Sequence, residues 1–259
     1  MKDTLTVIAV GDVVGRSGRQ VLKNRLQGLI DIHRADMVIA NGENAAGGKS
    51  ITPDVVKELL EIGVDVITTG NHVWDNREVL KVIDAEPALL RPANYPPGVK
   101  GHGYCIIDRK GFSVCVINLQ GRLFMDPIDC PFRAFDHIHQ EVSERADLII
   151  VDFHAEATSE KKAMGWYCDG RASAVFGTHT HVQTADERIL PGGTAYITDI
   201  GMTGSFNSII GVEKECSLNR FLTFTRVKFE AAEGDDGING ALFEFNRTGR
   251  AERIARILA

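Results

Sequence analysis

Short apolar runs alternate with amphipathic segments in the first third of the chain. The runs at 5–10, 37–40 and 66–68 have the nearly continuous apolar character of buried strands. Each leads through a polar loop into a segment with apolar residues three or four positions apart, the period of a helix packed on one face. The third of these helices is expected at 76–83. The pattern predicts three βα units of an α/β sheet.

The rest of the chain mixes hairpins with further βα units. Lys110-Gly111 is a turn between two strand-like segments, a helix is expected at 158–167, and 233–237 is expected to be a hairpin turn. With no repeat, linker or low-complexity segment, residues 1–259 are expected to form a single domain. The further strands are expected at 103–108, 112–118, 148–151, 172–176, 195–198, 223–229 and 240–246.

Polar side chains with ligand chemistry follow five of the expected strands. In an open α/β sheet, ligands bind beyond the carboxyl ends of the strands. Turn chemistry explains any one of these residues, but it does not explain why four of the eight histidines share this position with two acids and two asparagines. The residues are Asp12, Glu43, Asn44, Asn71, His72, His154, His179 and His181.

The stretch Gly177-Thr178-His179-Thr180-His181 is the strongest single signal. If the chain stays extended there, side chains two residues apart point the same way, so both imidazoles aim at one spot. A mixture of carboxylate, carboxamide and imidazole without thiolate suits a catalytic pair of Mn, Fe, Zn or Mg ions. Two metals about 4 Å apart, bridged by a carboxylate, clamp an in-line attack at phosphorus and lower the pKa of a shared water.

Three other motifs do not carry the chemistry that they suggest. The glycines at 11, 15 and 18 do not match the dinucleotide fingerprint G-x-G-x-x-G. The ending Gly48-Lys49-Ser50 suggests a phosphate-binding P-loop, but position 43 is Glu where that loop needs Gly, and a carboxylate would repel phosphate. His137 and His139 lie in a helical pattern, where residues two apart diverge, so they are expected on the surface.

Composition excludes several functional classes. With 35 acidic and 29 basic residues the net charge is -6, so nothing global attracts a polyanion, and no basic, aromatic-interleaved stripe indicates a long nucleic-acid track. No apolar stretch is long enough to span a membrane, and the first is too short for a signal peptide, so a cytoplasmic protein is expected. The five cysteines include no C-x-x-C pair and are expected to be reduced and mostly buried.

The strand-end motifs together resemble a known family. The order Asp12, Gly70-Asn71-His72, His154 and Gly177 to His181 resembles the calcineurin-like metallophosphoesterases. More closely, residues 11–15, 41–44, 70–74 and 177–184 resemble the bacterial YmdB-type branch, known as cyclic-nucleotide phosphodiesterases. The resemblance extends from about residue 5 to the C-terminus. It implies a four-layer α/β/β/α sandwich of two mixed sheets.

The resemblance also implies a role for each strand-end residue. Glu43 would bridge two metals, with His72 close by to donate a proton to the leaving oxygen or to stabilise charge on phosphorus. The sequence departs from the wider superfamily at Val14, which replaces a histidine ligand, and at Glu43-Asn44, which replaces Gly-Asp. Iron or manganese is expected, with zinc or magnesium as alternatives. One metal would take Asp12, Asn44 and His181, and the other Asn71, His154 and His179.

The expected function is hydrolysis of a small cyclic nucleotide of the 2′,3′- or 3′,5′-cAMP type by a two-metal phosphodiesterase. The candidates to contact the phosphate are Arg16, Arg122 and the turn ending at Gly204. The candidates to stack on a base are Phe124 and Phe132. Two alternatives stay open: a phosphomonoesterase or nucleotidase, and a regulatory protein that binds metal and nucleotide without needing turnover. A homo-oligomer is expected on general grounds only.

Overall fold

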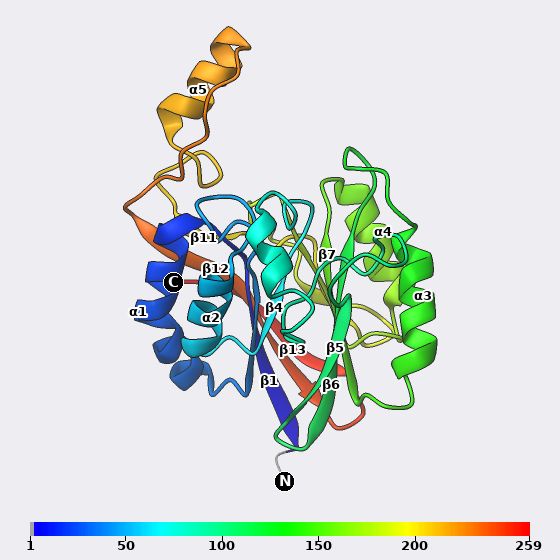
Figure 1. Cartoon of the computed structure of the whole chain (residues 1–259). Helices are drawn as coiled ribbons and strands as arrows, with labels where there is room; N and C mark the ends of the chain where they lie inside the picture. Colours follow the sequence, from blue (N-terminus) through cyan, green and yellow to red (C-terminus); the bar gives the residue numbers. More distant parts are fainter. Residues whose placement is uncertain (1–2) are drawn as a thin grey trace.

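Two mixed β-sheets packed face to face form the centre of the molecule (Figure 1). The computed structural model describes residues 3–259. The first sheet has the order β2 (Asp12–Val13), β11 (Met202–Ser205), β12 (Asp236–Asn246), β1 (Thr4–Val10), β3 (Met37–Asn41), β4 (Val66–Thr68), with β13 (Ala251–Leu258) also paired to β12. The second has the order β5 (Tyr104–Arg109), β6 (Phe112–Gln120), β7 (Leu148–His154), β8 (Ala174–Thr178), β10 (Ala195–Ile197), β9 (Arg188–Ile189).

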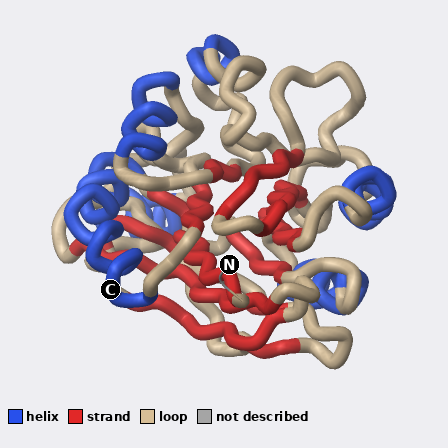
Figure 2. The backbone as a smooth tube through the Cα atoms, turned by 90° about the horizontal axis from the view of Figure 1, so that it is seen from below, coloured by secondary structure: helices blue, strands red, loops and turns tan. Residues whose placement is uncertain are grey.

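Helices cover the outer face of each sheet, and Figure 2 shows the strands enclosed between them. α1 (Gly15–His33) and α2 (Pro53–Glu61) pack on the first sheet, and α3 (Pro131–Val142) and α4 (Thr158–Cys168) on the second. The inner faces of the sheets meet in a third apolar cluster, where the rings of Phe176 and Phe243 lie 6.0 Å apart. The predicted α/β/β/α sandwich is confirmed.

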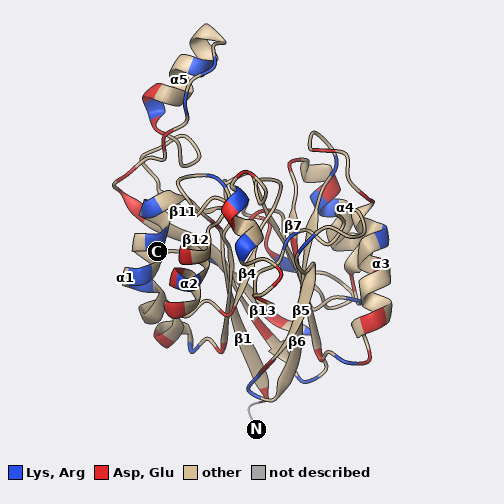
Figure 3. Cartoon of the chain, in the orientation of Figure 1, with Lys and Arg blue, Asp and Glu red and all other residues tan. Residues whose placement is uncertain are grey.

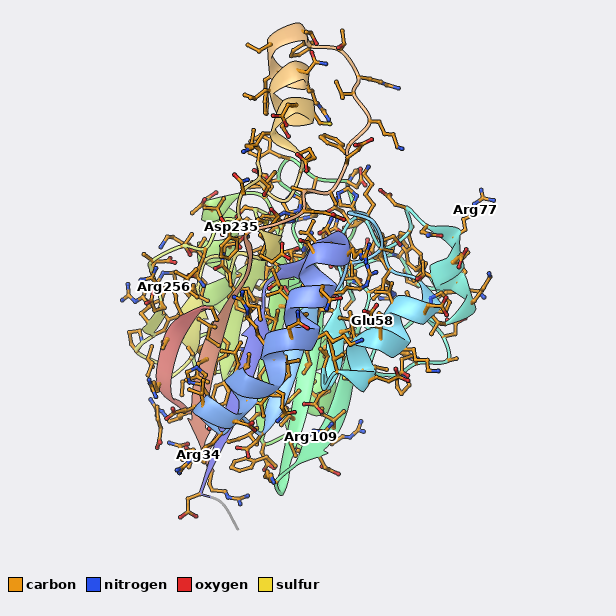
Figure 4. All side chains as sticks on the ribbon, turned by 90° about the vertical axis from the view of Figure 1, so that its left-hand side faces the viewer. Arg34, Glu58, Arg77, Arg109, Asp235 and Arg256 are labelled. Carbon is orange, nitrogen blue, oxygen red and sulfur yellow. The ribbon has the colours of Figure 1, made fainter. Side chains whose placement is uncertain are left out.

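Local sequence signals explain how α2 is placed. The Thr52 hydroxyl accepts a hydrogen bond from the Val55 amide at 3.4 Å, and Pro53 occupies the first turn, where its missing N–H is not needed. Arg19 of α1 donates to Glu58 of α2 over 2.7 Å, and Figure 4 shows these two helices side by side with Glu58 on the facing side. The two helices therefore cover the first sheet as a pair.

The strands that carry the polar loops run in the same direction. β1, β3 and β4 are parallel neighbours in the first sheet, and β6, β7 and β8 are parallel neighbours in the second. Their carboxyl ends therefore lie at one edge of each sheet. The two edges meet at the end of the molecule from which α5 (Lys214–Thr223) projects (Figure 1).

Three local predictions were wrong. Residues 76–83 form only a short 3-10 helix, η1 (Arg77–Lys81). The strand expected at 223–229 does not form: α5 ends at Thr223, and 224–230 have no regular structure, because no strand among the described residues pairs with them. Residues 233–237 are not a hairpin turn. They connect the irregular residues 224–230 to β12, and β12 pairs with β11, which precedes α5 in the chain.

The surface carries charges of both signs. Figure 3 shows Lys and Arg interspersed with Asp and Glu over the helices on both sides, in keeping with the small net charge. Within residues 3–259, none of the helices combines the length and the apolar character that crossing a membrane requires.

Candidate functional site

The polar loops of both sheets enclose a pocket of about 740 Å³. Glu43, Asn44, His72, His179 and His181, all predicted from the sequence, line it. The other three predicted residues lie behind this group. Asp12 contacts His181, and His154 contacts Glu43; both are completely buried. Asn71 contacts His154 and is partly exposed. The structure thus brings all eight strand-end residues to one place.

One cluster of ligand atoms surrounds the Nε2 atom of His154. Glu43 Oε1, Asn71 Oδ1 and His179 Nδ1 each lie 3.0 Å from it. Glu43, His154 and His179 place one ligand atom each within 4.8 Å of one another, close enough to hold a metal ion. The carboxamide oxygen of Asn71 adds a fourth ligand of the type that hard cations accept.

A second cluster lies around Asp12. Its Oδ1 atom is 3.8 Å from His181 Nε2 and 3.9 Å from His154 Nδ1, and none of the described residues donates a hydrogen bond to it. The Oδ1 atom of Asn44 is likewise buried without a hydrogen-bond partner. Buried oxygens left without a donor are rare in native proteins and call for an explanation. A bound cation supplies one, so this residue set fits a metal.

In His154, His179 and His181, one ring nitrogen lies within hydrogen-bond distance of a neighbouring oxygen. His154 Nδ1 lies 2.9 Å from the Thr178 hydroxyl, which donates to Asp152 over 2.7 Å. His179 Nε2 lies 3.0 Å from Glu156. Such outer contacts fix the tautomer and the ring orientation of metal-binding histidines.

The contact of His181 is the most informative of the three. Its Nδ1 lies 2.8 Å from the carbonyl oxygen of Ile210, which can only accept, so Nδ1 carries the proton. The other ring nitrogen, Nε2, faces Asp12 and is the atom available to bind a metal.

Gly70 leaves the space that the first cluster occupies. A Cβ atom at this position would lie 2.3 Å from His154 Nε2 and 2.4 Å from Glu43 Oε2, well inside any allowed contact. The loop after β4 can therefore approach the two side chains this closely only with glycine at position 70.

Burial and mutual charge set the ionisation of the clusters. Burial raises the pKa of Asp12. Burial also acts to raise the pKa of Glu43, but the imidazole of His154 outweighs it and lowers this pKa to about 2. Burial acts to lower the pKa of His154, yet the Glu43 carboxylate raises it to about 9. The buried carboxylates thus need a positive partner, which either an imidazolium or a metal cation provides.

The conformation around the two histidines of 177–181 differs from the prediction. β8 ends at Thr178, and His179 and His181 have φ angles of 98° and 63°. The chain therefore bends instead of staying extended, and the two rings face different partners. Both imidazoles line the same pocket, but the prediction that an extended strand aims them at one spot was wrong.

His72 lies at the rim of the pocket with 31% of its side chain exposed. Its amide donates to Glu43 Oε2 over 3.1 Å, which ties the loop to the first cluster. Its Nδ1 lies 3.0 Å from Asp75, and Asp75 is also 3.5 Å from Lys49 Nζ. The sequence prediction missed Asp75 and Glu156, although an acid two or three residues after a candidate histidine is a usable signal.

The predicted substrate contacts do not line the pocket. Arg16 and Arg122 are exposed elsewhere, and Gly204 is buried in β11 behind Val14. Phe124 and Phe132 are also absent from the lining. Much of the remaining lining comes from the chain on either side of α5, and it consists of Ile210, Gly211, Val212, Val227, Lys228, Phe229, Glu230 and Ala231.

Comparison with known proteins gives consistent matches over nearly the whole chain. The family described as YmdB-like protein matches residues 8–257. A 2′,3′-cyclic-nucleotide 2′-phosphodiesterase of Bacillus subtilis (strain 168) is 48% identical over 98% of this chain and 97% of its own.

Two solved structures share the fold and much of the sequence. A hypothetical protein from Thermus thermophilus has a TM-score of 0.93 and 45% identity, covering 98% of this chain and 99% of the other. A structure described as a novel phosphatase from Mycoplasma pneumoniae has a TM-score of 0.94 and 36% identity, covering 100% and 94%. These names support an enzyme of the phosphodiesterase or phosphatase class.

Proposed function

Because this chain belongs to the YmdB-like protein family, as its motifs predicted, we propose that it is a metal-dependent phosphodiesterase acting on 2′,3′-cyclic nucleotides. The name of the Bacillus subtilis relative, which matches over almost the full length of both chains, supports the substrate class. The metallophosphoesterase-like fold implies divalent metal ions.

The observation that carries the proposal is the pair of ligand clusters at the floor of the pocket. Asn71, His154 and His179 would hold one ion, and the oxygens of Asp12 and Asn44 that lack donors would join His181 on a second. Glu43 would be shared, and iron or manganese suits this set of ligands. When bound, such ions neutralise phosphoryl oxygens and lower the pKa of water.

His72 is proposed to hold the proton that the leaving oxygen needs. Asp75 accepts from Nδ1, which leaves Nε2 to face a ligand in the pocket. Hydrolysis adds water across one P–O bond of the ring, so the released ribose oxygen must gain a proton. A histidine placed at the rim can deliver it, a contribution of about 10² to 10⁴ in rate.

The walls of the pocket favour a nucleoside diester over a monoester. Val227 and Phe229 give part of the pocket lining an apolar surface suited to a base. The charged side chains that line the pocket outside the clusters are two lysines and two glutamates, which gives no surplus of positive charge for the second charge of a phosphomonoester. They are Lys49, Lys228, Glu156 and Glu230.

Product analysis tests the proposal. The purified chain, supplied with Mn²⁺, is incubated separately with 2′,3′-cAMP, 3′,5′-cAMP and 3′-AMP, and the products are separated by chromatography. Conversion of 2′,3′-cAMP to 3′-AMP without phosphate release is expected. Faster release of phosphate from 3′-AMP would favour the nucleotidase alternative, and tight binding of all three without turnover would favour a regulatory binding protein.

A further inference from the structure

A buried ion pair lies beside the proposed metal ligands without belonging to them. Lys161 Nζ and Asp199 Oδ2 are 2.6 Å apart, and each side chain is 1% exposed. Removing two charges from water is costly, and a buried pair often contributes no more stability than well-packed apolar residues. The contacts of the pair therefore have to indicate what it does.

Asp199 binds the turn that carries His179 and His181. Its Oδ2 atom accepts from the Thr180 amide at 3.2 Å and from the Thr180 hydroxyl at 2.8 Å. Its Oδ1 atom accepts from the Gly201 amide at 2.8 Å. One carboxylate thus holds both donors of the residue between the two histidines.

The turn needs such support because its backbone is unfavourable. His179 and His181 both have positive φ angles, a region that residues other than glycine rarely adopt and that persists only where surrounding contacts impose it. Thr180, held by Asp199, lies between these two positions. The amide of His179 also donates to Asp12 at 3.1 Å, so the turn is fixed from two sides.

Lys161 connects the turn to a helix. It lies on α4, which begins four residues after His154. Its aliphatic side chain packs against the end of β8, where a Cβ atom at Gly177 would be 3.0 Å from Lys161 Cδ. Its ammonium group compensates the charge of Asp199 where no solvent reaches. The two residues therefore join α4, the end of β10 and the turn into one unit.

We propose that Lys161 and Asp199 are positioning residues that hold the His179–His181 turn in its metal-binding shape. They touch neither metal nor substrate, and they act through Thr180. The inference rests on the metal centre of the proposed function, and it adds two residues outside the expected ligand set.

Asp186 offers a matched control for Asp199. It too accepts from a lysine, Lys162 at 3.0 Å, and from a threonine amide and hydroxyl, those of Thr198. Its remaining donor is the Thr184 hydroxyl at 2.7 Å, so its partners lie outside the histidine turn. Asp199→Asn and Asp186→Asn therefore remove the same charge from similar networks, only one of which supports the turn.

Metal affinity is the deciding measurement. Mn²⁺ binding to the purified full chain is titrated against a chromophoric chelator, and circular dichroism and the Tm are recorded alongside. Asp199→Asn is expected to bind Mn²⁺ about 10 to 100 times more weakly than wild type, the usual effect of losing an outer-shell contact, while Asp186→Asn binds normally. At saturating Mn²⁺ the kcat of Asp199→Asn should recover.

A lower Tm with unchanged Mn²⁺ affinity in Asp199→Asn would overturn the inference, because the pair would then serve stability alone. If Asp199→Asn fails to fold, Thr180→Val and Thr180→Ser are measured in its place. The valine variant is expected to bind Mn²⁺ more weakly than wild type, and the serine variant, which keeps the hydroxyl, to bind it normally. Equal Mn²⁺ affinity in the two variants would overturn the inference. A wild-type chain that binds no metal would instead overturn the proposed function, and this inference with it.

Discussion

Replacing Gly70 with alanine should disable the ligand clusters without unfolding the chain. The new Cβ would lie 2.3 Å from His154 Nε2 and 2.4 Å from Glu43 Oε2, whereas ordinary contacts begin at 3.4 Å. The loop or the two side chains must therefore move by about 1 Å. A displacement of about 1 Å at reacting groups costs on the order of 100-fold in rate. We expect at least this loss in kcat/KM, together with reduced metal content.

The assay is hydrolysis of 2′,3′-cAMP with Mn²⁺ present, with bound metal measured by mass spectrometry on the same samples. Gly28→Ala is the matched control, because Gly28 is exposed in α1 and a Cβ there would meet nothing within 4 Å. Alanine should stabilise that helix by up to about 1 kcal/mol and leave the rate unchanged. Wild-type rate and metal content in Gly70→Ala would refute the placement of the clusters against this loop.

Three further predictions concern single side chains. His72→Ala should lower kcat by about 10² to 10⁴ while metal content stays at the wild-type level; loss of metal instead would make His72 a ligand. Burial acts to raise the pKa of Asp186, but hydrogen bonds from threonines lower it to about 2. The carboxylate of Asp186 therefore stabilises the fold fully above about pH 4, and this contribution is lost as the pH falls toward 2. The free energies of unfolding of wild type and Asp186→Asn, measured in urea, should differ at pH 6 and converge near pH 2. A thiol reagent should label only Cys130 and Cys216 in the native chain, since the other three thiols are buried; labelling of all five before unfolding would contradict the fold.

The sequence predicted the layered fold and the convergence of the eight strand-end residues. The resemblance to the metallophosphoesterases implied the four layers, whereas local signals predicted the convergence, because apolar runs mark buried strands and parallel strands bring their carboxyl ends together. The detailed reason given for the histidine motif was wrong, since the bend at His179 depends on Asp12 and on Asp199, which lie far away in sequence. Such contacts leave no periodic pattern.

The substrate wall was the least predictable part of the site. Residues 224–230 include Thr225, Val227 and Phe229, residue types common in strands, but among the described residues no strand pairs with them, and they have no regular structure. Phe229 lines the pocket because the chain returns from α5 toward the two sheets (Figure 1). Arg16 and Arg122, the phosphate contacts expected from the sequence, do not line the pocket, because the sequence does not show where this segment returns to the sheets.

Metal stoichiometry combined with diesterase activity tests the central claim most directly. The chain is purified without chelator or affinity metal, its metal content is measured by mass spectrometry, and hydrolysis of 2′,3′-cAMP is followed with and without added Mn²⁺. About two metal ions per chain are expected, with metal and activity both reduced in Glu43→Gln. A wild-type chain that neither binds metal nor hydrolyses the diester when Mn, Fe or Zn is supplied would contradict it.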